Sequence, residues 1–304
     1  MRTLPSNAKI YVPEDESQVK GTLQIIHGMA EHQGRYADFA NFLKDHGYAV
    51  ATSDLRGHGN NVQREEELGY FGDNAVDNLV NDAHEITLYL KERFSSVPCM
   101  LLGHSMGTMI STVYFKKYNA FIDALFLSGI PGKNNAANLG IAITKVIQSG
   151  KGEYYKSEFL DNVLNGPFRK PFKKENSKVS WICSDPAVWK AYEEDPKCGF
   201  LFTVNGYRTV LDLMQYTTTN KMTWIKKRMD IPIRFMSGQF DPCMGGFSKL
   251  KGAAAMFRKE GYTDVTYVTY DGMRHEILND FKKDEVYNYI LTEMDKVSEN
   301  KKNP

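Results

Sequence analysis

The chain has 304 residues, and its 38 Lys and Arg residues against 37 Asp and Glu residues give a formal net charge of +1. A chain of this length can bury the core of one large α/β domain or of two smaller ones without disulfides or metal ions. The balanced charge creates no global field that would draw the protein to nucleic acid or to an acidic partner, so we expect no nucleic-acid partner.

The N-terminal part of the chain predicts two strands and a loop that could carry chemistry. Residues 9–12 are expected to form a short edge strand, and the apolar residues 21–27 a second strand that ends at His27-Gly28. In a sheet that presents a nucleophilic serine at a strand end, as predicted below, a His-Gly step leaving a strand usually supplies half of the oxyanion hole. The residue after the glycine then donates its backbone N–H, which assigns that role to Met29. The polar neighbours are expected to brace the loop by hydrogen bonds: His27, Glu31 and His32.

The next predicted elements are a helix, a strand and a longer helix. Residues 35–46 have the apolar periodicity of a helix that ends before Gly47, and residues 48–54 form a strand that runs into a glycine-containing turn. Asp54 at this turn is expected to pair with Arg56 and pin the loop. The alternative, Asp54 as the acid of a catalytic triad, is disfavoured because Asp54 precedes the candidate nucleophile described below by two elements. Residues 74–94 form a long helix with one apolar face.

The motif Gly103-His104-Ser105-Met106-Gly107 marks the candidate nucleophile. An apolar run precedes the motif and a helical apolar pattern follows it, so a buried strand turns sharply into a helix at Ser105. Side chains at the two glycine positions would collide with neighbouring backbone, and the strained turn directs the serine hydroxyl away from the sheet. The Met106 N–H, at the start of the helix, is assigned as the second oxyanion donor.

The segment after the next strand differs in composition from the rest of the chain. Residues 123–130 form another buried strand, and the alternation of strands and helices up to this point implies a parallel sheet with helices on both faces. From residue 131 to residue 230, strand signals nearly vanish and amphipathic helical patterns take over. We therefore predict a core formed by residues 1–130 and 231–304, with residues 131–230 as a helical cap placed over the serine.

The C-terminal part returns to the sheet and supplies two polar residues at strand ends. Asp241 follows a strand at residues 231–238, where a loop carboxylate can orient an imidazole. His275 follows the last strand, at residues 266–270, so both side chains are expected at the sheet edge where Ser105 lies. The order Ser105, Asp241, His275 is that of a triad built on an α/β sheet. The remaining predicted elements are helices at residues 246–261 and 285–297 and a frayed tail at residues 298–304.

These motifs together resemble the α/β-hydrolase superfamily, and within it the lysophospholipase and monoacylglycerol lipase branch that is sometimes grouped with serine aminopeptidases. The motifs occur in the expected order on both sides of the predicted cap, whereas the cap itself shows no such match. The residues that carry the resemblance are His27-Gly28-Met29-Ala30-Glu31-His32 with Arg35-Tyr36, Asp54-Leu55-Arg56-Gly57-His58-Gly59, Gly103-His104-Ser105-Met106-Gly107, Ser237-Gly238-Gln239-Phe240-Asp241-Pro242 and Arg274-His275-Glu276. One departure is Asn60-Asn61, where the family commonly has a serine nearby.

The resemblance implies a serine hydrolase that uses neither a metal ion nor an organic cofactor. In such an enzyme His275 takes the proton from Ser105, Asp241 holds the imidazolium, and the N–H groups of Met29 and Met106 bind the oxyanion. The implied substrate is a small carboxylic ester with one acyl chain, such as a monoacylglycerol or a lysophospholipid. The residues that bind this substrate are not identified by the motifs.

Two alternatives remain open at this stage. An aminopeptidase of the same fold would need cap carboxylates for a substrate ammonium group, and the candidates are Glu153, Glu158, Asp161, Glu193 and Glu194. A non-catalytic protein that binds a small ligand in the pocket is the second alternative, although such proteins typically lack a triad member.

Cys243 resembles a cysteine near the active site of some monoacylglycerol lipases, and it fits equally well as a small loop residue.

The cysteines and the N-terminus bear on the location of the protein. Cys99, Cys183, Cys198 and Cys243 have no paired spacing, which indicates reduced thiols and disfavours metal binding by these cysteines. The first 18 residues lack the apolar stretch of a signal peptide, and no window has the apolar length needed to span a bilayer. We therefore expect a cytoplasmic protein, with transient contact to a membrane surface through the cap left open.

Overall fold

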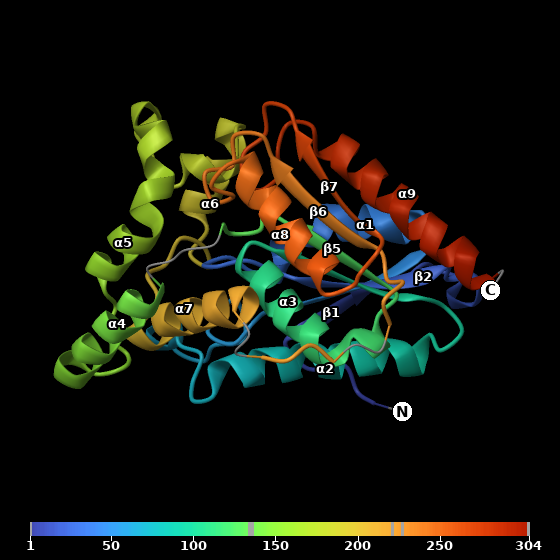
Figure 1. Ribbon diagram of the computed structural model, residues 1–304, viewed down its shortest axis with the longest axis horizontal. Coiled ribbons are helices and arrows are strands. Elements are labelled where there is room, and N and C mark those ends of the chain that lie inside the picture. Colours follow the sequence, from blue (N-terminus) through green and yellow to red (C-terminus); the bar gives the residue numbers. More distant parts are fainter. Residues whose placement is uncertain (1, 133–136, 220–221, 226–227, 303–304) are drawn as a thin grey trace.

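The computed structural model describes residues 2–132, 137–219, 222–225 and 228–302 and contains a seven-stranded sheet (Figure 1). The strand order is β1-β3-β2-β4-β5-β6-β7, and β1 runs antiparallel to β3 while the other pairs are parallel. The predicted α/β class with a mostly parallel sheet is therefore confirmed. The strands are β1 (Ala8–Tyr11), β2 (Gly21–Ile26), β3 (Tyr48–Ser53), β4 (Cys99–His104), β5 (Ala124–Ser128), β6 (Ile233–Gly238) and β7 (Val265–Tyr270).

Helices cover both faces of the sheet. Leu102 of β4 lies in the hydrophobic core between the sheet and α1 (Ala37–Asp45) and α9 (Lys283–Lys302), and its neighbour Leu101 lies in the core on the opposite face. This alternation follows from the two-residue period of a strand. Because both faces are covered, the central strands are buried along their whole length and are predominantly apolar. The helices are α1 and α9 on one face, and α2 (Ala75–Arg93), α3 (Met106–Tyr118) and α8 (Phe247–Lys259) on the other.

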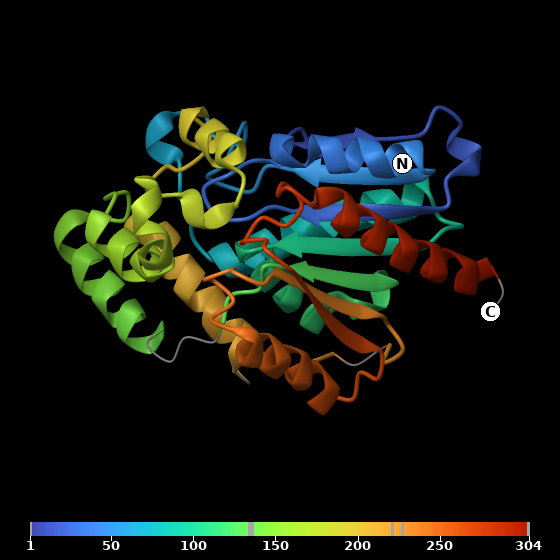
Figure 2. The ribbon, with the colours of Figure 1, turned by 90° about the horizontal axis from the view of Figure 1, so that it is seen from above.

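The segment between β5 and β6, here called the insertion, contributes no strand to the sheet in its described part. Its helices gather at one end of the sheet in two perpendicular views, and Figure 2 shows the arrowheads of the central strands on that side (Figures 1 and 2). These helices are α4 (Ala137–Lys151), α5 (Glu158–Arg169), α6 (Pro186–Glu194) and α7 (Val204–Thr218). The predicted start of the insertion falls partly on residues 133–136, which lie outside the described residues, as do residues 220–221 and 226–227.

Two predicted helices differ from the structure at their ends. The helix predicted from residue 35 begins as a 3-10 turn, because His32 Nδ1 accepts the Gly34 N–H (3.1 Å) and caps a tighter first turn. The tail predicted to fray from residue 298 instead continues α9 to Lys302. Ser298 is buried there and donates its hydroxyl to Met294 O (3.0 Å), while residues 303–304 lie outside the described residues.

The turn after β3 also departs from the prediction. Arg56 forms a two-bond ion pair with Asp82 of α2 (2.5 and 2.9 Å), so the expected pair between Arg56 and Asp54 is wrong. The Asp54 carboxylate accepts hydrogen bonds from the backbone N–H groups of Gln33 (2.9 Å) and Asn60 (2.8 Å) and holds the loop by those bonds.

The 3-10 turns of the described residues are η1 (Glu16–Gln18), η2 (Gln33–Tyr36), η3 (Glu65–Glu67), η4 (Asn119–Phe121), η5 (Lys170–Glu175) and η6 (Ser180–Ile182). Among the described helices, none combines the length and apolar character needed to cross a bilayer.

Candidate active site

Ser105 occupies a strained turn between β4 and α3. Its backbone has φ of 52° and ψ of −118°, a conformation that residues with a side chain rarely adopt. A Cβ atom at Gly103 would lie 2.4 Å from Gly107 O, and one at Gly107 would lie 2.1 Å from Ile26 O. Because backbone approaches this closely at both positions, only glycine fits there. The structure therefore has the strand-turn-helix geometry that the motif predicts.

Ser105 lines a cavity of about 280 Å³ between the sheet edge and the insertion. The loops after the parallel strands form one wall, and the insertion supplies most of the opposite wall. A lining of this composition suits an apolar chain next to a few polar groups. The apolar side chains around it that the motifs did not identify include Met109, Val163, Leu164, Pro167, Phe168, Val179, Trp181, Phe200, Val210 and Met214.

His275 and Asp241 meet in the loops after β7 and β6. His275 Nδ1 lies 3.0 Å from Asp241 Oδ2, and both side chains are buried. The carboxylate also accepts the Ser237 hydroxyl (3.0 Å) and the Cys243 N–H (2.8 Å). Because Asp241 accepts a hydrogen bond from Nδ1–H of a neutral His275, the Nε2 atom carries no proton and can act as a base. Nε2 is buried without a hydrogen-bond partner among the described residues, and His275 lines the same cavity as Ser105.

The charges of this pair favour a protonated His275. Burial by itself lowers the pKa of His275, but the Asp241 charge and hydrogen bond raise it above its ordinary value. For Asp241, burial acts to raise the pKa, and the opposing effects of His275, Cys243 and Ser237 leave it below the ordinary value. An imidazolium formed during a reaction would therefore be stabilised at this position.

Met29 and Met106, the two residues assigned as oxyanion donors, lie at the same cavity. Met29 belongs to the loop after β2, and Met106 is the first residue of α3, where helix N–H groups have no intrahelical acceptor. Within the described residues, neither backbone N–H has a hydrogen-bond partner. Both amides are thus available to a group bound beside Ser105.

The insertion contacts the His275 loop directly, which the motifs did not predict. The Trp181 ring lies 5.0 Å from the His275 ring, measured between centroids. The Glu276 N–H donates to Ile182 O (2.7 Å), and the Arg274 guanidinium donates to Ser180 O (2.6 Å). Trp181 lies in a 3-10 turn with no apolar periodicity, so no sequence pattern marks its place at the site.

The carboxylates considered for an aminopeptidase are not gathered at the cavity. Asp161 lines the cavity, and it is paired with Arg169 at 2.7 Å. The other four candidates, Glu153, Glu158, Glu193 and Glu194, are absent from the described cavity lining. The structure therefore offers no free carboxylate beside Ser105 from this set for a substrate ammonium group.

Two groups of possible metal-ligand atoms occur among the described residues, each with its atoms within 4.8 Å of one another. They are Asp241, Cys243 and His275, and His32, Asp195 and Cys198. In each group a histidine nitrogen is already hydrogen-bonded to the carboxylate, at 3.0 and 2.8 Å. Burial raises the pKa of both thiols, which disfavours the thiolate that a metal ion binds. The contact between Cys243 and Asp241 is made by the Cys243 backbone N–H, which donates to the carboxylate.

Known proteins similar to this chain include lipases and esterases. The monoacylglycerol lipase of Mycolicibacterium smegmatis is 23% identical over 292 residues, 94% of this chain and 92% of that protein. The monoglyceride lipase of Mus musculus is 24% identical, over 90% of this chain and 81% of that protein. A thermostable carboxyl esterase from Bacillus coagulans, solved in complex with glycerol, superposes with a TM-score of 0.86 at 26% identity, over 96% of this chain and 94% of the esterase.

A family profile covers most of the chain. The profile of Hydrolase_4, described as serine aminopeptidase, S33, matches residues 17–282. This match contains the Ser105 turn, the Asp241 and His275 loops and the whole insertion. The chain therefore belongs to the Hydrolase_4 (serine aminopeptidase, S33) family and has the α/β-hydrolase fold.

Proposed function

We propose that the protein is a serine hydrolase that cleaves carboxylic esters with a single acyl chain, such as monoacylglycerols or lysophospholipids. The observation that carries this proposal is the meeting of a strained Ser105 and a buried His275-Asp241 pair at one largely apolar cavity. The similarity to monoacylglycerol and monoglyceride lipases over most of the chain supports the choice of ester. The absence of a free carboxylate from the five candidates at the cavity argues against the aminopeptidase alternative.

The proposed mechanism has two acyl-transfer steps. His275 Nε2 accepts the proton of Ser105 as the serine oxygen attacks the ester carbonyl, and Asp241 stabilises the imidazolium. The N–H groups of Met29 and Met106 hold the oxyanion. The imidazolium then gives its proton to the departing alcohol, and water, activated by His275, hydrolyses the acyl-serine. The protein groups that act in these steps line the cavity or hold His275.

We further propose that residues 131–230 act as a cap on a core formed by residues 1–130 and 231–304. The insertion supplies Phe168, Trp181 and Met214 to the cavity, opposite the loop that carries Met29. A wall of this kind would hold the acyl chain and exclude bulk water from the acyl-enzyme.

Contact between this cap and a lipid surface is also part of the proposal. Helices α4 and α5 lie at the same end of the molecule (Figures 1 and 2) and expose large apolar side chains. Val146 on α4 is 74% exposed, and Phe159 on α5 is 57% exposed. Val163 on α5 is exposed as well and lines the cavity, so an apolar path would run from a lipid surface toward Ser105.

The proposed function is tested by hydrolysis of p-nitrophenyl esters from acetate to palmitate, a monoacylglycerol, a lysophosphatidylcholine and proline p-nitroanilide. We expect wild type to turn over esters and Ser105→Ala to lose at least about 10³-fold in kcat, because the nucleophile is removed while the oxyanion donors remain. Turnover of the anilide alone would favour the aminopeptidase, and no turnover together with no fluorophosphonate labelling of Ser105 would contradict the proposed function.

A further inference from the structure

The loop after β2 is held on both sides of Met29. The Gly28 N–H donates to Glu31 Oε1 (2.5 Å), and the Ala30 N–H donates to His58 Nε2 (3.2 Å). Among these successive amides, the Met29 N–H is the one without a partner in the described chain. The backbone N–H groups on either side of Met29 therefore have hydrogen-bond partners, and the Met29 N–H is left for a ligand.

The Glu31 carboxylate lies at the centre of this arrangement. Glu31 is only 2% exposed and accepts hydrogen bonds from the Gly28 N–H (2.5 Å), the Tyr36 hydroxyl (2.8 Å) and the Arg35 guanidinium (2.9 Å). A Cβ atom at Gly28 would lie 2.7 Å from Glu31 Oε1. The carboxylate thus contacts the loop backbone at Gly28, the residue before Met29.

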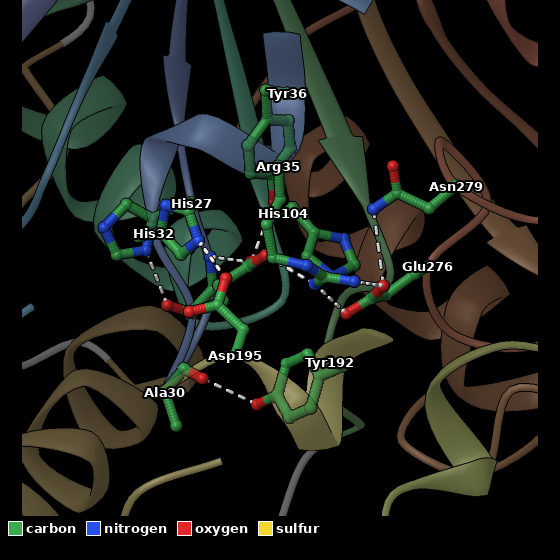
Figure 3. A network of polar contacts seen from close by, with 12 residues as sticks. His27, Ala30, His32, Arg35, Tyr36, His104, Tyr192, Asp195, Glu276 and Asn279 are labelled. Carbon is green, nitrogen blue, oxygen red and sulfur yellow. Dashed lines mark hydrogen bonds and ion pairs between the residues drawn. The ribbon is translucent and has the colours of Figure 1, made fainter. Parts of the chain in front are cut away.

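Arg35 connects this carboxylate to the His275 loop. Its guanidinium donates two hydrogen bonds to Glu276, both of 2.5 Å, and Figure 3 shows the two side chains facing one another. Glu276 is buried and follows His275 directly. The insertion closes the network, because the Tyr192 ring covers the guanidinium at 4.8 Å. Two loops that carry separate parts of the proposed machinery are therefore joined through one largely buried cation.

The Tyr192 hydroxyl ties the same network to the loop backbone. It donates to Ala30 O (2.6 Å), as Figure 3 shows, and the Gly199 N–H donates to the same carbonyl (2.9 Å). His32 Nε2 contacts Asp195 at 2.8 Å beside it. The insertion thus contributes hydrogen bonds that hold the Met29 loop from the outside, while Glu31 holds it from within.

We propose that Glu31 is a positioning residue for the ester hydrolysis proposed above, on which this inference rests. Its carboxylate fixes the loop in the conformation that presents the Met29 N–H to the oxyanion, and through Arg35 it couples this loop to the loop of His275. Its charge also stabilises the imidazolium that forms when the Ser105 proton moves to His275 Nε2.

The groups around His275 explain the effect of this charge. Asp241 faces it from the loop after β6, Glu276 adjoins it, Glu31 lies in the loop after β2, and the His104 ring at the end of β4 lies 4.8 Å away. Burial lowers the pKa of His275, while Asp241, Glu276 and Glu31 raise it. Burial and His275 itself lower the pKa of His104 to about 3, so His104 is neutral under assay conditions.

The test compares wild type with Glu31→Gln, which keeps the side-chain shape and removes the charge. We expect kcat for a p-nitrophenyl ester to fall by about 100-fold, near the loss of one oxyanion donor, with little change in KM. The acid limb of the rate profile should move to lower pH, because loss of a nearby negative charge lowers the pKa of His275. Glu276→Gln should move the acid limb in the same direction.

Glu293→Gln is the matched control. Glu293 on α9 pairs with Arg234 on β6 at 2.5 Å, and both side chains are only 9% exposed. This buried pair is not part of the described cavity lining. We expect the control to lose thermal stability while keeping the kcat and the acid limb of wild type, so a merely structural effect of losing a buried carboxylate is separated from positioning.

The outcomes distinguish this inference from the proposed function. An active wild type whose kcat and acid limb are unchanged in a folded Glu31→Gln would show the inference to be wrong and leave the proposed function standing. A wild type without Ser105-dependent turnover would remove the proposed function, and this inference with it. If Glu31→Gln does not fold by circular dichroism, the acid limb of Glu276→Gln decides.

Discussion

The protonation of His275 sets the pH range in which a site of this kind works. The histidine must be neutral to accept the Ser105 proton, and Asp241 raises its pKa above the ordinary value of 6.5 against the lowering effect of burial. The rate is therefore expected to be full at high pH and to fall as the pH decreases through this raised pKa. A pH series of kcat/KM measures the position of this acid limb directly.

At the same residue scale, Asp241→Asn should lower kcat by about 10⁴-fold, because the imidazole loses its orientation and the imidazolium its stabilising charge. The acid limb should also move to lower pH, since the group that raises the pKa of His275 is gone. Asp82→Asn, which removes a half-exposed partner of Arg56 on α2, is the control and should leave both properties unchanged. An unshifted acid limb in Asp241→Asn would contradict the proposed role of this carboxylate.

At the scale of elements, the contact between α3 and β2 determines how sharply the chain can turn at Ser105. Gly107→Ala would place a Cβ atom 2.1 Å from Ile26 O, so the helix must move away from the strand. We expect a destabilisation of about 1–3 kcal/mol or more and a loss of ester hydrolysis. Urea denaturation checks the first effect and a p-nitrophenyl ester assay the second.

Gly252→Ala on α8 is the matched helical control, because nothing lies within 4 Å of the Cβ atom that it adds. It should stabilise the protein by about 0.5–1 kcal/mol through helix propensity and leave activity unchanged. Equal destabilisation by the two substitutions would mean that the close approach of α3 to β2 does not limit the turn.

At the scale of the whole molecule, the exposed apolar residues of α4 and α5 predict contact with lipid vesicles. The double variant Val146→Ser and Phe159→Ser should reduce co-sedimentation with phosphatidylcholine vesicles, because both side chains are more than half exposed and apolar. Phe247→Ser on α8, whose side chain is 53% exposed, is the control and should bind as wild type does. Hydrolysis of a short p-nitrophenyl ester should stay the same in all three proteins, and vesicle binding that is equal in all would contradict the predicted lipid contact.

Local patterns in the sequence were sufficient to predict the sheet, the helices on its faces and the turn at Ser105. Strands buried on both faces are predominantly apolar, and the two glycines of the turn are required by backbone that lies only a few residues away or in the neighbouring strand. The meeting of His275 with Asp241 also follows from order alone, because parallel strands deliver their following loops to one edge. The assignment of catalytic roles to these residues stays a prediction.

Contacts between loops that are distant in sequence were decided only by the tertiary structure. Arg56 reaches Asp82 instead of Asp54, and Arg35, which also binds Glu31, reaches Glu276 across 241 positions. Trp181 covers His275 although its segment carries no periodic pattern. Such pairs depend on how loop ends and the insertion pack around a shared edge, and a charged or aromatic side chain within reach of several partners takes the one that packing brings nearest. Periodicity reports which face of an element is buried, and it carries no information about which loop lies opposite.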